Sequence, residues 1–232
     1  MGNRECATAS PAPRGISTFQ ARVLRWYYEA GREFPWRRPT ASRYRKVVAE
    51  VLLQRTRAET VLAFYPRFVA DFPSWRRLAS ASEAELREYL EPVGLWRRRA
   101  STLRRLSHEM VVRRGRFPDC RSEIEDLPGV GQYIANSILL LVHEKPEPLL
   151  DGGMARVLER YFGPRELVDI RFDPYLQQLA RKVVDHESSA EVSWALLDLS
   201  AMICRPNRPI CDQCPVRRGC RFATKVRRER AT

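Results

Sequence analysis

A chain of 232 residues, of which 44% are hydrophobic, is long enough to form one large globular domain or two smaller ones. Its 41 Lys and Arg exceed its 28 Asp and Glu, and the formal net charge of +13 favours a polyanionic partner over a merely basic, soluble surface. No apolar run is long enough to cross a bilayer and the first residues lack a signal-peptide pattern, so we expect an intracellular, soluble protein without membrane attachment.

The elements, taken in chain order, begin with residues 1–18, whose Ala, Pro and Arg predict a flexible arm. Apolar positions at helical spacing then predict an all-α chain, because no stretch alternates as a strand would. Ser82 and Glu85 have the spacing of a capping box at the start of the fourth helix. The predicted helices cover residues 19–30, 44–59, 61–71, 81–91, 96–114, 133–142, 154–161, 175–185 and 192–202.

A glycine turn, LPGVG at residues 127–131, precedes the helix predicted at 133–142. Its glycines allow positive φ or a close backbone approach, and the helix that follows presents free N–H groups and a positive dipole end. These features are typical of a backbone cradle for one phosphate, and an ordinary interhelical turn is the alternative. The residues predicted to bind this phosphate are Leu127, Gly129, Val130, Gly131 and Gln132.

A second short stretch, LLDGG at residues 149–153, places Asp151 just before the helix predicted at 154–161. From the residues alone, an Asp in this place is more often the N-cap of a helix than a catalytic group. A carboxylate there could also stabilise a developing positive charge or activate a water molecule, and capping and catalysis can coexist.

Four of the six cysteines stand close together near the C-terminus with the spacing C-x6-C-x2-C-x5-C. Four thiolates within one short loop can wrap a single soft-metal centre, either a tetrahedral zinc ion or a 4Fe–4S cube. Cys6 and Cys120 are predicted to be ordinary free thiols. The predicted metal ligands are Cys204, Cys211, Cys214 and Cys220.

Together these stretches resemble the helix-hairpin-helix DNA glycosylase superfamily, which includes endonuclease III, adenine DNA glycosylases and thymine-guanine mismatch glycosylases. The resemblance also rests on REFPWRR, AEVLLQRT and LLDLSAMIC, and it covers roughly residues 19–224. It implies a six-helix barrel lobe at 37–145, a cluster lobe formed by 19–36 and 146–224, and a basic tail at 225–232. It also favours a 4Fe–4S cluster in the cysteine loop, with zinc as the alternative.

The resemblance implies roles for particular residues. Asp151 matches the aspartate at the scissile glycosidic bond, and Glu50 matches a carboxylate that faces the extruded base and whose pKa would be raised on an apolar helix face. Tyr133 stands where strand-cutting relatives have the lysine that forms a Schiff base, which predicts a monofunctional enzyme and is similar to the mismatch glycosylases. Relatives contact DNA at the gap left by the flipped base through the positions of Gln54, Arg55 and Thr56, for which an exposed polar helix end is the alternative explanation.

The predicted function is therefore a base-excision-repair glycosylase that acts as a monomer on double-stranded DNA and removes thymine or uracil opposite guanine. The first alternative is an adenine DNA glycosylase acting opposite guanine or 8-oxoguanine, although such enzymes have a further C-terminal domain and this sequence stops soon after the cysteine loop. The second is a DNA-binding protein without catalysis, because Gly153 stands where relatives usually have a polar residue. The expected location is the prokaryotic cytoplasm, at the nucleoid.

Overall fold

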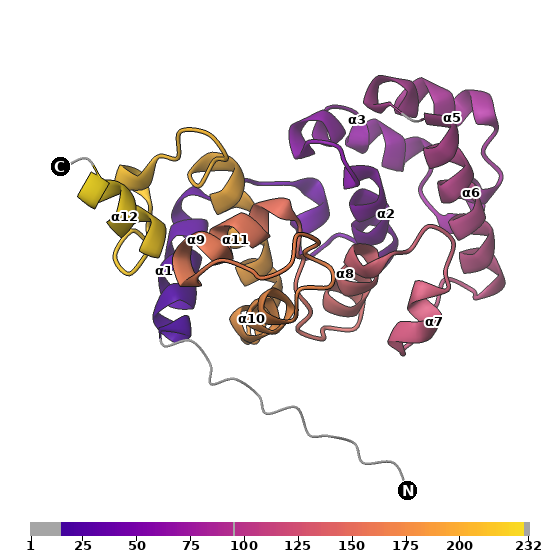
Figure 1. Ribbon diagram of the computed structural model, residues 1–232. Coiled ribbons are helices and arrows are strands. Elements are labelled where there is room, and N and C mark those ends of the chain that lie inside the picture. The colour runs from indigo at the N-terminus through magenta and orange to yellow at the C-terminus, as the bar shows by residue number, and fades with distance from the viewer. Residues whose placement is uncertain (1–14, 95, 230–232) are drawn as a thin grey trace, which may run out of the picture. The chain divides into compact units, whose positions relative to one another are not determined.

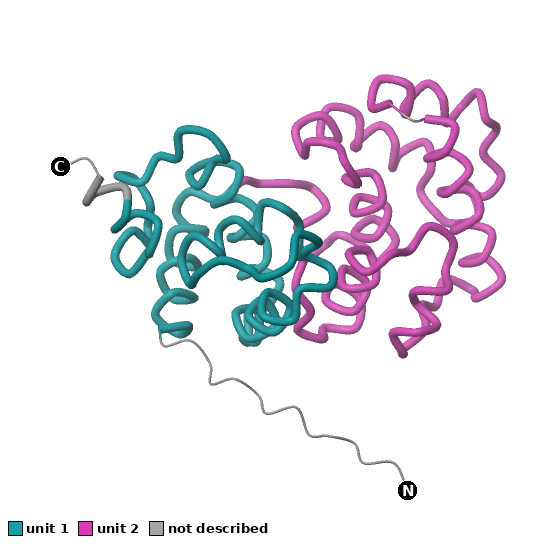
Figure 2. The backbone as a smooth tube through the Cα atoms, viewed as in Figure 1, with its two compact units in different colours: residues 1–31, 150–232 teal, residues 32–149 magenta. Residues whose placement is uncertain are grey.

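The computed structural model describes residues 15–94 and 96–229, and within these ranges the chain contains helices and turns but no strand (Figure 1). The predicted all-α class is therefore confirmed for the described residues. The chain divides into two compact units, unit 1 with residues 1–31 and 150–232 and unit 2 with residues 32–149 (Figure 2). Most of the predicted arm and the end of the predicted tail lie outside the described residues. Within the described ranges, no helix has the length and apolar character that a bilayer crossing requires.

Unit 2 has a single core beneath helices that are mostly short. Helix α2 packs against α3 and α8, α6 packs against α4 and α5, and α7 packs against α8. Val47, Phe68 and Ile138 are among the side chains buried in this core. Its elements are η1 (Pro35–Arg37), α2 (Arg43–Leu53), α3 (Ala58–Asp71), α4 (Trp75–Ala79), α5 (Glu83–Leu90), η2 (Glu91–Val93), α6 (Trp96–Val112), α7 (Arg121–Glu125) and α8 (Gln132–Val142).

Helix boundaries in unit 2 follow the sequence signals at some ends and not at others. The capping box at α5 is present, because Glu85 N donates to Ser82 Oγ while the Glu85 carboxylate accepts from Ser82 N. The helix predicted at 44–59 ends instead at Leu53, and α3 begins at Ala58. Between them the backbone leaves the helical path, with Arg55 in the left-handed region at φ 57°.

The limits of unit 2 differ by a few residues from the predicted limits of 37 and 145. The rings of Phe34 and Trp36 stack with centroids 4.7 Å apart and are buried in the unit 2 core. The segment just before residue 37 therefore belongs to this unit. At the other end, Asn136 Nδ2 donates to the carbonyl oxygen of Pro148 at 2.8 Å. These contacts extend unit 2 to residues 32–149.

Unit 1 combines the first helix of the described chain with the C-terminal part. Helix α9 packs against α10, α11 and α12, while α1 packs against α10 and α11. Phe19 on α1 meets the rings of Tyr161 and Phe162 at 4.6 and 5.2 Å. Gln20 Nε2 donates to Val183 O at 3.0 Å, near the C-terminus of α10. Its elements are α1 (Ile16–Ala30), α9 (Gly152–Phe162), α10 (Pro174–Val184), α11 (Ser189–Met202), η3 (Cys211–Gln213) and α12 (Arg221–Glu229).

Candidate functional site

The LPGVG turn joins α7 to α8 and exposes backbone while its apolar side chains are buried. Leu127 and Val130 belong to the unit 2 core, and Val130 N donates to Leu127 O at 3.0 Å. Gly129 has φ 77°, and a Cβ added there would lie 2.1 Å from Thr102 Cγ2. Gly131 is exposed and caps the N-terminus of α8, where the first amides have no partner within the helix. This turn can therefore offer an anion its backbone N–H groups but not the side chains of Leu127 and Val130.

Two predicted site residues lie on the contacting helices α2 and α8 of unit 2. Glu50 on α2 is only 3% exposed, so its carboxyl group is largely removed from solvent. Tyr133 on α8 is half-buried against the core, and Gln132 beside it is also half-buried.

The predicted DNA-contact residues Gln54, Arg55 and Thr56 form the turn between α2 and α3. Gln54 and Arg55 are exposed, whereas Thr56 is half-buried. Arg99 on α6 donates to Gln54 O at 2.7 Å and to Thr56 Oγ1 at 2.9 Å. The sequence does not single out Arg99, because nothing in the apolar periodicity of α6 distinguishes it from the other arginines of that helix.

Asp151 in unit 1 is the N-cap of α9, as a local interpretation of the sequence predicts. Its Oδ1 accepts a hydrogen bond from Met154 N at 2.7 Å. Desolvation raises the pKa of Asp151, and the amides of Met154 and Gly153 together with the charge of Arg156 offset only part of that rise. The residue is nevertheless exposed, so solvent reaches a carboxylate that is surrounded by protein. This combination suits a group that must meet both a substrate and a water molecule.

Gly153 marks a close approach between α9 and α11. A Cβ added at this position would lie 2.4 Å from Ser200 Oγ and 3.1 Å from Ser200 Cβ. Ser200 Oγ is itself held by a 2.7 Å hydrogen bond to Leu197 O. Ser200 thus fills the space that a side chain at position 153 would need. Position 153 lies two residues after Asp151, the N-cap of α9.

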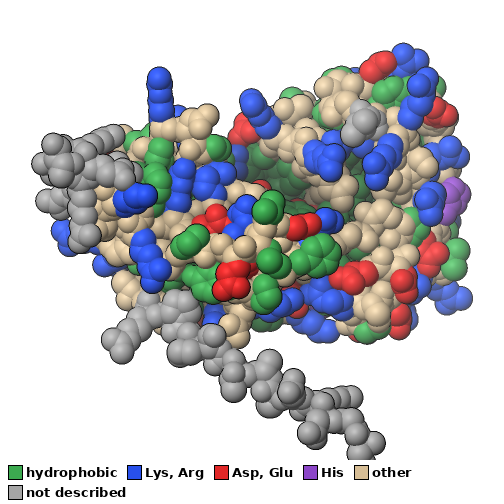
Figure 3. All heavy atoms as spheres, in the orientation of Figure 1, with side chains coloured by type: hydrophobic (Ala, Val, Ile, Leu, Met, Phe, Trp, Pro, Cys, Tyr) green, Lys and Arg blue, Asp and Glu red, His purple; other side chains and the backbone are tan. Residues whose placement is uncertain are grey.

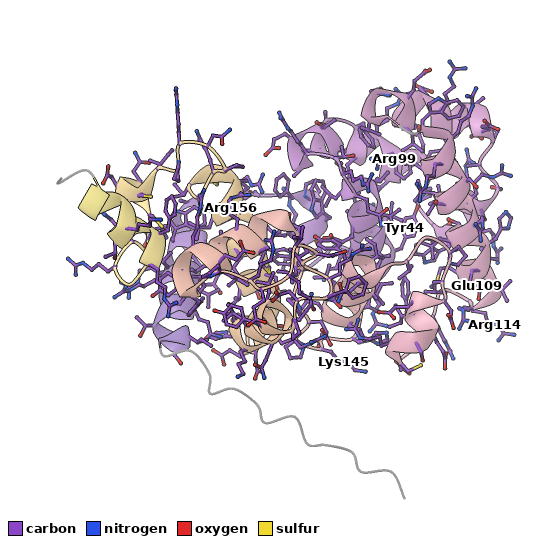
Figure 4. All side chains as sticks on the ribbon, in the orientation of Figure 1. Tyr44, Arg99, Glu109, Arg114, Lys145 and Arg156 are labelled. Carbon is purple, nitrogen blue, oxygen red and sulfur yellow. The ribbon has the colours of Figure 1, made fainter. Side chains whose placement is uncertain are left out.

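Arg156 connects the start of α9 to the end of α11 and to the cysteine loop (Figure 4). Its Nε donates to Cys204 O at 2.8 Å, and its Nη2 donates to Ser200 O at 3.1 Å. Its Nη1 lies 3.4 Å from Gly152 O, the residue after Asp151. One guanidinium therefore links the backbone of the candidate catalytic helix to the first cysteine.

The four cysteines of the loop line one shared cavity. Arg160 and Arg217 line the same cavity, and Arg160 Nη1 lies 3.4 Å from Cys204 Sγ. Burial raises the pKa of Cys214 to about 12, and the neighbouring cysteine sulfurs contribute to the rise. Among the described residues, no three His, Cys, Asp or Glu side chains are arranged to hold a metal ion.

Positive side chains are spread over the visible face of the molecule and do not form one compact patch (Figure 3). Exposed arginines lie on several helices, among them Arg25 on α1, Arg76 on α4 and Arg104 on α6. Such a distribution fits contact with the repeated phosphates of a nucleic acid better than recognition of one small anion.

Comparison with known proteins identifies a matching family and similar enzymes. The model of the family described as HhH-GPD superfamily base excision DNA repair protein matches residues 48–171. The thymine-DNA glycosylase of Aeropyrum pernix is 37% identical over 210 residues, which are 88% of this chain and 94% of that protein. The thymine/uracil-DNA glycosylase of Pyrobaculum aerophilum is 37% identical over 211 residues, which are 88% of this chain and 91% of that protein. The adenine DNA glycosylase of Mus musculus is 31% identical over 231 residues, but only 43% of that protein is covered.

Solved structures show the same architecture. A thermostable thymine-DNA glycosylase superposes with a TM-score of 0.83 at 29% identity, over 91% of this chain and 98% of that one. A trapped endonuclease III–DNA covalent intermediate superposes with a TM-score of 0.76 at 19% identity, over 94% of this chain and all of that one, and this supports the fold alone.

Proposed function

Because this chain belongs to the HhH-GPD superfamily of base excision DNA repair proteins, we propose that it is a monofunctional DNA glycosylase that removes thymine or uracil opposite guanine. The two 37% identical relatives, which are matched over nearly their whole length, are named for thymine or for thymine and uracil. The observation that carries the proposal is Asp151, an exposed carboxylate fixed at the N-terminus of α9 with a raised pKa.

In the proposed reaction, breaking the bond between base and sugar leaves positive charge on the sugar. Ionised Asp151 stabilises that charge electrostatically and accepts a proton from the attacking water. Its raised pKa makes it a stronger base than an ordinary aspartate, which favours this proton transfer. The products are a free base and an abasic site in an intact strand.

Unit 2 contributes the remaining groups of the proposal. Backbone amides at Gly129 and Gly131 bind a phosphate and set the position of the strand. Buried Glu50 faces the extruded base, where a protonated carboxyl group can donate a hydrogen bond to it. Tyr133 has no amine and therefore forms no Schiff base with the sugar, which is why we propose a glycosylase without strand cleavage.

The experiment for this proposal compares duplexes that differ only in one base pair. T:G and U:G duplexes should yield abasic sites, revealed as strand breaks after alkali, whereas the matched T:A and U:A duplexes should remain intact. Excision confined to A:G or A:8-oxoguanine duplexes would instead establish the adenine enzyme. Strand breaks that form without alkali would contradict the role given to Tyr133, and binding without any product would favour a non-catalytic protein.

The cysteine loop fits a 4Fe–4S cluster as the bound cofactor. Four cysteine sulfurs around one cavity match the four thiolates that such a cube requires, and Arg160 and Arg217 supply positive charge beside them. Metal binding requires the thiolate form of these cysteines, so it would release their protons. When bound, the cluster would hold the loop between α11 and α12 together. The ligands would be Cys204, Cys211, Cys214 and Cys220.

Elemental analysis separates the cluster from its alternative. A cluster requires roughly four iron and four acid-labile sulfide per chain and a brown colour, whereas a structural zinc site requires roughly one zinc and gives a colourless protein. Replacement of Cys214 by Ser should lower the metal content and the unfolding temperature together. A zinc content near one, without iron in anaerobically prepared protein, would overturn the cluster.

A further inference from the structure

One side chain of unit 2, Arg99, joins several separate pieces of backbone around the turn that precedes α3. Its Nε donates to Gly94 O at 3.1 Å, and its Nη1 donates to Leu52 O at 3.2 Å. Its Nη2 donates both to Gln54 O at 2.7 Å and to Thr56 Oγ1 at 2.9 Å. The residue is half-buried and lies on α6, far along the sequence from the turn (Figure 4).

Three of these acceptors, on Leu52, Gln54 and Thr56, belong to the end of α2 and the turn that follows it. The last carbonyl groups of a helix have no partner within the helix, and a cation beside them is favourable because that end carries partial negative charge. Here Gln54, not a glycine, follows the last helical residue. Arg55 then adopts φ 57°, a conformation that favours glycine. Arg55 thus has a backbone conformation that a residue other than glycine disfavours, and the hydrogen bonds from Arg99 stabilise the turn that contains it.

The turn exposes the side chains of Gln54 and Arg55. Thr56 is half-buried, and its Oγ1 accepts a hydrogen bond from Arg99. Desolvation lowers the pKa of Arg99, and the charge of Arg55 lowers it further, but a guanidinium remains charged at any physiological pH. The repulsion between these two cations would be relieved by a phosphate beside Arg55, so the turn is suited to contact with a DNA strand.

We propose that Arg99 is a positioning residue that holds the Gln54–Thr56 turn in the shape needed to occupy the gap left by the extruded base. The inference rests on the proposed glycosylase function and adds a separate claim to it. Arg99 acts on base extrusion and leaves the bond-breaking step to other residues. Extrusion costs a few kcal/mol, least for bases that are not paired, so a group that lowers this cost matters most for paired targets.

The test uses Arg99→Lys with Arg98→Lys as its matched control. Lysine keeps the charge but has one nitrogen, which cannot reach Gly94 O, Leu52 O and the turn at the same time. Arg98 is the adjacent, exposed arginine of the same helix. Thermal unfolding of both variants is measured first, and Thr56→Val, which removes only the hydroxyl acceptor, replaces the Arg99 variant if that variant fails to fold.

Two readouts separate positioning from a general structural effect. The first is single-turnover excision of a T:G duplex compared with a duplex whose target base is already unpaired in a bulge. The second is the fluorescence of 2-aminopurine placed next to the target, which rises when the target leaves the stack. Arg99→Lys should slow excision from the T:G duplex roughly 10- to 100-fold, equivalent to the loss of one or two hydrogen bonds.

On the bulged duplex the same variant should be within about threefold of the wild type, its fluorescence rise should be reduced, and its pH–rate profile should keep its midpoint. Arg98→Lys should match the wild type within about twofold throughout. Equal slowing on both duplexes, or no slowing on either, would overturn the positioning role. If the wild type excises nothing, the proposed glycosylase fails, yet the fluorescence comparison on T:G DNA still decides whether Arg99 controls extrusion.

Discussion

Replacing Asp151 by Asn separates the two roles that the structure gives to this residue. Asn and Asp are about equally good N-caps, so the variant can still accept the hydrogen bond that Met154 N donates to Oδ1 at 2.7 Å. The change removes only the negative charge. Asp151→Ala removes the cap as well and should lower the free energy of unfolding by about 1 kcal/mol.

The effect of Asp151→Asn on stability has a sign that follows from the raised pKa. A carboxyl group whose pKa is higher in the folded than in the unfolded protein binds its proton more tightly when folded. The stability it contributes is present below the ordinary aspartate pKa and is lost as the pH rises through the folded-state value. The Asn variant has no such loss, so it should be at least as stable as the wild type at neutral pH, with the difference disappearing in acid. The exposure of Asp151 keeps this difference small.

The catalytic loss should be large by comparison. Removing a carboxylate that stabilises developing charge and accepts a proton should slow single-turnover excision by about 10²- to 10⁴-fold, or about 3–5 kcal/mol of activation free energy. In the wild type, the rate should fall in acid with a midpoint above that of an ordinary aspartate.

The assay is single-turnover excision of T:G and U:G duplexes over a range of pH, alongside thermal unfolding and DNA binding by all three proteins. Since the Asn variant contains an Asn-Gly-Gly sequence that is prone to deamidation, its mass is checked before each assay. Full activity in a variant of correct mass would remove Asp151 from the catalytic site. A loss of stability as large as that of Asp151→Ala would refute the account of the cap.

Other expectations follow from the glycines and from charge. Gly129→Ala should lower the free energy of unfolding by about 2 kcal/mol or more, because it combines a left-handed φ with a 2.1 Å clash against Thr102. Gly131→Ala meets nothing within 4 Å and should lower it by less than about 0.5 kcal/mol. Thermal unfolding measures both changes. Gly153→Ala should cost about 1–3 kcal/mol, and adding Ser200→Ala should recover part of that loss in a double-mutant cycle, so simple additivity would disprove the close packing. DNA affinity measured by fluorescence anisotropy should fall roughly 10³-fold or more between about 50 and 200 mM salt, and a flat salt dependence would argue against phosphate contacts.

Local signals in the sequence predicted most of the helices because their causes lie within a few residues. The capping box of Ser82 and Glu85 and the N-cap at Asp151 each depend on residues three positions apart. The end of α2 could not be predicted in the same way, because apolar spacing continues past Leu53. The bonds that stabilise the turn come from Arg99, on another helix. Short helices such as α4 and α7 were missed since their few residues define no periodicity.

The predicted site residues divide in the same way, into those with local causes and those that depend on contacts from distant helices. The glycine turn at 127–131 and the cysteine spacing are continuous in the sequence, and the structure gives each a defined local geometry. The sequence shows that position 153 departs from the family pattern but does not show why. The reason is Ser200, which lies on a helix distant in sequence and fills the space that a side chain at position 153 would need. Arg156, which joins α9 to Cys204, was missed for the same reason.

The composition of unit 1 from both ends of the chain has a consequence for biosynthesis. Helix α1 leaves the ribosome first, but the carbonyl groups that Gln20 and Arg22 bind belong to Val183 and Arg218. At roughly 5–20 residues per second, the wait between α1 and its partners lasts on the order of ten seconds, during which unit 2 can be completed. The apolar face of α1, with Phe19 and Val23, therefore stays without its native cover for that interval.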